Sequence, residues 1–111
     1  MAIKRIWHGW TTPENADTYR TLLHNEVFPE IERKNIPGYI SIELLQREFD
    51  NEVEFITIMT FQSLQNVMAF QGEDYTRCYV PEAAQKLLKR WDRFSSHYEV
   101  IENRVYVKSD T

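Results

Sequence analysis

The sequence is poor in cysteine and glycine, and this scarcity excludes several kinds of chemistry. Its single cysteine, Cys78, can form no internal disulfide and has no cysteine or histidine neighbour at zinc-site spacing. We expect a buried or half-buried structural thiol in a reducing, intracellular compartment. The three glycines, Gly9, Gly38 and Gly72, build neither a phosphate-binding loop nor a nucleophile elbow. Three scattered histidines with no tight carboxylate spacing make no convincing metal site.

Long apolar runs and a basic stripe are also missing. No stretch approaches the ~18 consecutive apolar residues of a membrane-spanning helix, and the N-terminus lacks the apolar middle of a signal peptide. The net charge is −4, so we expect no nucleic-acid partner. We interpret the cations at 86, 89, 90 and 93 as complementing the dipole at the end of a helix. The sequence predicts a cytoplasmic protein without membrane contact.

Aromatic residues, in contrast, are abundant, at 14% of the 111 residues. A domain of this size buries only about two-thirds of the surface of its unfolded chain. So many large rings therefore favour an additional interface or a pocket. We expect one domain over residues 1–107 and a loose tail at 108–111.

The apolar periodicity predicts an alternation of strands and helices. A first strand covers 3–10, and Thr12 and Pro13 begin a helix that Pro29 breaks or kinks near 25–28. Strands at 39–49 and 53–61 form a hairpin, and Ser63 caps a helix that ends at Gly72. Pro81 begins a third helix. The last strand covers 94–101, and 104–107 are a candidate extension. The third helix turns four residues inward: Ala84, Leu87, Leu88 and Trp91.

This order predicts an α+β, ferredoxin-like βαββαβ fold, with helices on one face of an antiparallel four-stranded sheet. The third strand is apolar on both sides, because Ile56 and Ile58 alternate with Phe55 and Met59. A sheet that is apolar on both sides needs a cover on each face. With no further segment to supply the second cover, we predict a homodimer.

Five segments carry a resemblance to a known family. They are Arg5-Ile6-Trp7-His8-Gly9, Pro37-Gly38-Tyr39, Phe61-Gln62-Ser63, Phe70-Gln71-Gly72-Glu73-Asp74 and His97-Tyr98-Glu99. With them, residues 3–101 resemble the antibiotic biosynthesis monooxygenase superfamily of dimeric α+β barrels, in a subgroup mostly named by homology. Related barrels host oxygenases, isomerases and haem degraders, so the fold alone does not define the activity.

The resemblance implies an oxygenase that works without metal, flavin or haem. A phenolic or enolic substrate is deprotonated, its anion reacts with O2, and the protein binds, orients and manages protons. The implied substrate is an aromatic or polyketide-like compound, held between the sheet and its helices. One alternative is a non-catalytic dimer that binds a small ligand. Haem degradation is a third reading, but relatives with that activity use a histidine on the second helix. Residues 63–72 contain none, and His24 lies on the first helix.

Two histidines are the candidate catalytic residues. His97 is the candidate proton acceptor or anion stabiliser, because an imidazole titrates near neutral pH. His8 is the second candidate. Each also has a structural reading, as a hydrogen-bonded residue of the core or of a dimer interface. Because the two occupy the first and the last strand, they need not share a site.

The candidate substrate-binding residues are aromatic or cationic: Trp7, Tyr75, Tyr79, Arg5 and Arg77. Tyr75 follows an acidic pair in a loop, where its phenol is a lid, a hydrogen-bond donor or a loop anchor. Arg5, expected near the pocket mouth, and Arg77 bind an anionic group of the substrate or form ion pairs with nearby acids. The acids are Glu73, Asp74 and Glu99.

Overall fold

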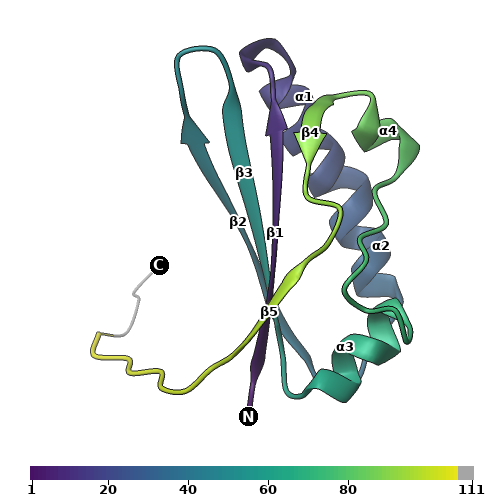
Figure 1. Ribbon diagram of the computed structural model, residues 1–111, viewed down its shortest axis with the longest axis vertical. Coiled ribbons are helices and arrows are strands. Elements are labelled where there is room, and N and C mark those ends of the chain that lie inside the picture. The colour runs from purple at the N-terminus through teal and green to yellow at the C-terminus, as the bar shows by residue number, and fades with distance from the viewer. Residues whose placement is uncertain (108–111) are drawn as a thin grey trace.

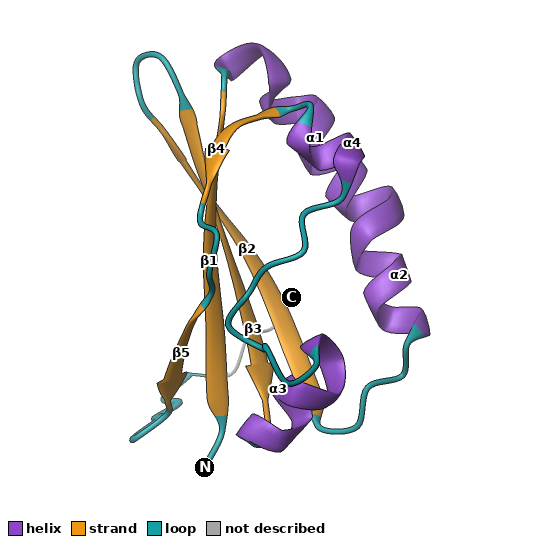
Figure 2. Cartoon of the chain, turned by 45° about the vertical axis from the view of Figure 1, so that its right-hand side comes forward, coloured by secondary structure: helices purple, strands orange, loops and turns teal. Residues whose placement is uncertain are grey.

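The computed structural model describes residues 1–107, which form one antiparallel sheet with helices on a single side (Figures 1 and 2). The sheet order is β2-β3-β1-β4, and β5 also pairs with β1. Its strands are β1 (Ile3–Thr11), β2 (Tyr39–Glu48), β3 (Val53–Phe61), β4 (Leu88–Trp91) and β5 (Ser96–Glu99). The predicted ferredoxin-like fold is confirmed. The predicted tail at 108–111 lies outside the described residues.

The helical layer follows the local signals in the sequence. Its helices are α1 (Ala16–Leu22), α2 (Phe28–Arg33), α3 (Leu64–Gln71) and α4 (Glu82–Gln85). The Thr12 side chain caps a 3₁₀ turn, Pro13–Asn15, before α1, and Ser63 caps α3. The expected break before Pro29 is a π-helical turn, Leu23–Val27. This turn accommodates Pro29, whose backbone nitrogen has no hydrogen to donate to the helix. None of these helices is long and apolar enough to cross a membrane.

The fourth position of the sheet is filled by two short strands rather than one. β4 pairs with Gly9–Thr11 at one end of β1, and β5 pairs with Ile3–Ile6 at the other. Between β4 and β5 the chain pairs with the loop before α4 instead. The amide of Cys78 donates to the carbonyl of Arg93 at 3.1 Å, and the amide of Ser95 donates to that of Thr76 at 2.7 Å. This pairing holds the loop against the sheet.

The prediction of a long third helix was wrong beyond Gln85. Residues 88–91 form β4, and the predicted last strand shrinks to Ser96–Glu99. The apolar spacing of Leu88 and Trp91 fits either structure, since both still face the core. The strand forms because the edge of β1 from Gly9 to Thr11 has backbone groups that need partners. Of the cations expected at a helix end, only Lys86 lies there, as the C-cap of α4. Lys89 and Arg90 lie in β4, where Arg90 pairs with Glu52 at 2.8 Å.

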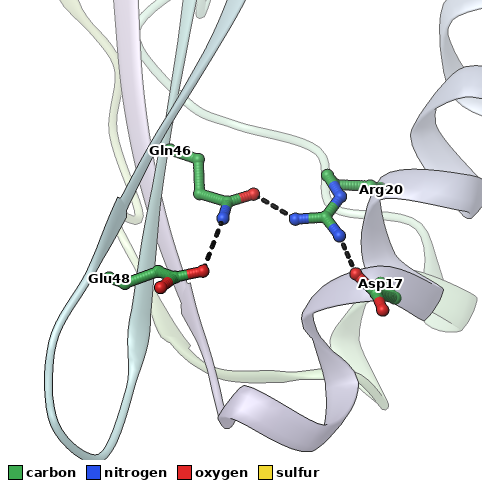
Figure 3. Close-up of polar contacts among 4 residues, drawn as sticks. All are labelled: Asp17, Arg20, Gln46 and Glu48. Carbon is green, nitrogen blue, oxygen red and sulfur yellow. Dashed lines mark hydrogen bonds and ion pairs between the residues drawn. The ribbon is translucent and has the colours of Figure 1, made fainter.

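The core lies between the sheet and the helices, in two clusters. One surrounds Tyr19 and Phe55, whose ring centroids are 5.0 Å apart. The other surrounds Phe61 and Val67, which are both fully buried. A polar chain of four exposed or half-buried side chains (Figure 3) connects α1 with the edge strand β2: Asp17, Arg20, Gln46 and Glu48. Such surface contacts stabilise little, so the buried rings determine how the helices sit.

We call the two sides of the sheet the covered face and the open face. Odd-numbered residues of β1, such as Arg5 and Trp7, point to the covered face, as do their partners on β3. Even-numbered residues of β1, such as Ile6 and His8, point to the open face, which carries no helix in the described chain (Figure 2). The open face also carries Ile56 and Ile58 of β3, and both of these side chains are only partly buried.

Candidate functional site

A cavity of about 120 Å³ lies where the two core clusters meet, between the covered face and the helices. An apolar cavity of roughly 150 Å³ can take up benzene, so one aromatic ring is the expected size of a ligand here. Apolar side chains from the π-helical turn, α2, α3, α4 with the segment before it, and the strands β2 and β3 supply most of the wall. The polar or partly polar lining residues are Arg5, Trp7, Tyr19, Thr57, Gln71, Cys78 and Tyr79.

Arg5 is the one charged residue in that wall, and it is only 7% exposed. Its Nη2 donates to two loop carbonyls, those of Tyr75 at 3.4 Å and Arg77 at 3.2 Å. Its Nε is enclosed and has no hydrogen-bond partner. The guanidinium carbon lies 5.6 Å from the centre of the Phe70 ring. Within residues 1–107, no carboxylate lies within ion-pair distance of Arg5.

The strand alternation of β1 is the reason that Arg5 is buried. It lies between Ile3 and Trp7 on the covered face and opposite Met59 of β3. Burial lowers the pKa of Arg5, but an arginine stays charged in proteins. Arg5 was expected near the pocket mouth, but it lies in the buried part of the cavity wall. A buried cation with only neutral partners is a costly arrangement.

Trp7 and Tyr79 line the same cavity, as their assignment to substrate binding requires. The Trp7 indole donates from Nε1 to the carbonyl of Asp92 at 2.7 Å, which fixes the ring. Gly9 leaves room for that ring, since a Cβ there would lie 2.8 Å from Cη2 of Trp7. Tyr79 is 80% exposed and therefore lies at the cavity's outer edge.

Cys78 is half-buried, as the sequence predicts, but it also lines the cavity. Its Sγ lies 2.8 Å from Oγ of Ser95, a residue of the segment between β4 and β5. Burial raises the pKa of the Cys78 thiol, and the hydrogen bond with Ser95 and the charge of Arg5 oppose that shift. Sequence reasoning missed this placement, along with Thr57 and Gln71, because periodicity does not show which loop packs on which strand.

His97 lies beside Arg5 on the covered face and does not line the cavity. The two are cross-strand partners in the pairing of β1 with β5. The imidazole meets the Tyr75 ring edge-on, with centroids 5.1 Å apart, and its Nε2 is enclosed without a partner. Burial, followed by the charge of Arg5, lowers the pKa of His97. The ring is therefore neutral at neutral pH and able to accept a proton.

His8 and Arg77 lie elsewhere. His8 is on the open face, where its Nδ1 is 2.9 Å from a carboxylate oxygen of Glu54 and its ring stacks on Trp10. The structure thus separates the two histidines by the thickness of the sheet. The Arg77 side chain is exposed and pairs with Asp74 at 3.2 Å, as the structural reading anticipated. Only its backbone carbonyl reaches the site, by accepting from Arg5.

Metal ligands do not gather at this site. Residues 1–107 contain no group of three histidine, cysteine, aspartate or glutamate side chains arranged to hold an ion. The absence of a resident cofactor remains a prediction, which absorbance and metal analysis of the purified protein will test.

Comparison with known proteins identifies the fold. No family model and no curated protein matches the sequence. Among solved structures, a candidate antibiotic biosynthesis monooxygenase from Bacillus cereus superposes with a TM-score of 0.71 and 9% identity. The match covers 98% of this chain and 100% of that one. The chain has the fold of the antibiotic biosynthesis monooxygenases.

Two further structures share this fold. SnoaB, a cofactor-independent oxygenase from Streptomyces nogalater, superposes with a TM-score of 0.57 and 12% identity, covering 92% of this chain and 95% of its own. A dimeric ferredoxin-like protein from an uncultured marine organism superposes with a TM-score of 0.65 and 8% identity, and the match covers 96% of this chain and 92% of that one. At these identities the likeness concerns the fold, and the sequence resemblance to the superfamily fits it.

Proposed function

We propose that the protein is a cofactor-independent monooxygenase of the antibiotic biosynthesis monooxygenase superfamily. The observation that carries this proposal is the cavity lined by aromatic and aliphatic side chains beside one buried cation, within a fold shared with a cofactor-independent oxygenase. Its substrate is an aromatic compound of one ring, or the end ring of a larger polyketide-like compound. We assign substrate contact to Trp7, Tyr79 and Arg5.

The reaction needs only the substrate, O2 and proton transfer. The substrate loses a proton, its carbanion or enolate passes an electron to O2, and the resulting radicals combine to a peroxide. Loss of water then leaves a new carbonyl, so that CH2 and O2 give C=O and H2O, with all four electrons supplied by the substrate. Arg5 stabilises the anion. We assign proton acceptance to His97, whose enclosed Nε2 has no partner, and orientation of that ring to Tyr75.

Oxygen uptake tests this proposal. Chelator-treated protein is supplied with a panel of hydroxyaromatic compounds and anthrones, and O2 consumption is recorded. We expect turnover with at least one compound and loss of at least 100-fold in His97→Ala, because general-base catalysis contributes about that much. His24→Ala, a change of an exposed histidine, is the matched control. A folded His97→Ala protein that keeps its activity contradicts the assigned base.

One observation favours the alternative of a non-catalytic small-ligand-binding protein. Neither candidate histidine lines the cavity of the single chain. Ligand binding without O2 consumption across the panel would support this alternative.

We also propose that the protein is a homodimer joined through its open faces. Ile6, Ile56 and Ile58 lie there partly uncovered, and a ferredoxin-like relative in fold is dimeric. His8 would then lie at the subunit interface. Sedimentation is expected to show a dimer at micromolar concentration, with Ile58→Lys dissociating it because a stable interface of over ~1,000 Å² tolerates no unpaired central charge. A wild-type monomer at that concentration overturns the homodimer.

A further inference from the structure

We propose that the cavity selects ligands that carry one negative charge on an aromatic ring, and that Arg5 is the residue that recognises this charge. This inference rests on the proposed function only for the location of the ligand, and it names the ligand's chemical class: an aromatic oxyanion, either carboxylate or phenolate.

The charge of Arg5 is uncompensated in the described chain. Arg5 is only 7% exposed, yet its side-chain hydrogen bonds go to two neutral carbonyls, those of Tyr75 and Arg77. Removal of a charge from water costs several kcal/mol unless an opposite charge replaces the water. Within the described chain no carboxylate does so, whereas the exposed Arg90 has an acidic partner in Glu52.

The space beside Arg5 suits an aromatic ring. The cavity holds about 120 Å³ and is lined mainly by apolar groups, among them Trp7, Phe28 and Phe70. A ring placed there gains apolar contact, and an oxyanion on it meets the one cation in the wall. A neutral ring would leave Arg5 unpaired, and a cationic ring would be repelled.

The neighbours of Arg5 do not balance its charge. His97 is its cross-strand partner, Cys78 lines the cavity beside it, and the Tyr75 loop holds its Nη2. None of these groups supplies a negative charge: an imidazole is neutral or cationic, and burial raises the pKa of the Cys78 thiol, which favours its neutral form. The ligand is therefore the source of the missing negative charge.

The test uses three ligands of one shape and different charge: benzoate, benzamide and benzamidine. Calorimetry and thermal shift are expected to give the tightest binding for benzoate, about tenfold to a hundredfold weaker binding for benzamide, and none for benzamidine. A phenolate arm uses 4-nitrophenol, whose ionised form absorbs at longer wavelength. Binding is expected to increase the ionised fraction. Benzoate is also expected to slow the alkylation of Cys78, which locates it in the cavity.

Two variants test the role of Arg5. Arg5→Met is expected to lose the preference for benzoate over benzamide, while benzamide affinity changes less than about threefold. Arg5→Lys keeps the charge and is expected to retain part of that preference. Circular dichroism checks that both fold, and the ligand series on the wild-type protein stands independently of either variant.

The outcomes separate this inference from the proposed oxygenase. Equal affinity for benzoate and benzamide overturns the anion preference and leaves the aromatic cavity in place. A charge preference that survives in Arg5→Met removes Arg5 as the recognising residue. Strong benzoate binding without O2 consumption by any compound supports this inference and overturns the oxygenase.

Discussion

The two faces of the sheet differ in whether their enclosed polar side-chain atoms have hydrogen-bond partners. On the open face, no enclosed side-chain polar atom of the described residues lacks a partner. Three side chains there pair with a neighbouring strand or loop: His8 with Glu54, Lys4 with Thr60 and Arg90 with Glu52. On the covered face, three enclosed polar atoms have none in the described chain. They are Nε of Arg5, Oγ1 of Thr11 and Nε2 of His97.

This difference supports the proposed location of the site on the covered face. Buried polar atoms without partners are uncommon in folded proteins, and each one calls for a reason. Departures from local consistency concentrate at functional sites. Two of the three unpartnered atoms belong to the cross-strand pair Arg5 and His97, beside the cavity. The open face has no enclosed unpartnered polar atom in the described chain, and its isoleucines are partly uncovered, which fits the proposed homodimer.

The largest expected effect compares adjacent residues on opposite faces. Phe55→Ala removes a fully buried ring packed on Tyr19 and is expected to cost about 3–5 kcal/mol of unfolding free energy. Ile56→Ala on the open face is expected to cost about 1 kcal/mol at low protein concentration, and more at high concentration if a second copy covers it. Urea denaturation measures both. A smaller loss for Phe55→Ala than for Ile56→Ala contradicts the division into core and open face.

A smaller effect of opposite sign is expected at Thr11. This residue is fully buried and its hydroxyl has no partner, so Thr11→Val removes a desolvated polar group at nearly constant shape. We expect stabilisation by about 1–2 kcal/mol. Thr60→Val on the open face is the matched control, because the Thr60 hydroxyl accepts from Lys4 at 3.3 Å. That change is expected to give no stabilisation. Loss of stability in Thr11→Val would show that a water or ligand satisfies the hydroxyl.

The fold was largely predictable because its local signals agree with one another. The hairpin of β2 and β3, the caps at Thr12 and Ser63, and the break before Pro29 appear where the sequence indicates. The failure at β4 has a physical cause. Strand formation there depends on the unpaired edge of β1, which lies almost eighty residues earlier, and a helical spacing of apolar residues carries no information about that edge.

The site was predictable only in part, for a related reason. Alternation along β1 groups Arg5 with Trp7 on one face and His8 on the other. It does not reveal that the face of Arg5 is the covered one. The pairing of Arg5 with His97 follows from the split fourth strand, and the contact of Cys78 with Ser95 follows from loop pairing. Neither is encoded by spacing.

A pH-dependent effect is expected from His97. Because burial and Arg5 place its folded-state pKa below the unfolded value of about 6.5, the unfolded chain binds the proton more readily. Stability is therefore unaffected by this group above that pH and falls as pH decreases through it. The slope of stability against pH should be modest, since the His97 ring is only half-buried. His97→Gln is expected to reduce the slope and His24→Gln to leave it unchanged in thermal melts between pH 8 and 5. An unaltered slope in His97→Gln contradicts the assignment.

The smallest effect is expected at Arg77, the second cationic candidate for binding the substrate. Its side chain is 71% exposed and pairs with an equally exposed Asp74, so Arg77→Ala should change stability by less than about 0.5 kcal/mol. The carbonyl that accepts from Arg5 belongs to the backbone and remains in the variant. We therefore expect benzoate affinity within about twofold of wild type, against the large loss in Arg5→Met. A tenfold loss in Arg77→Ala would place anion recognition on the loop surface, and the contrast between a satisfied exterior and an unsatisfied covered face would no longer locate the site.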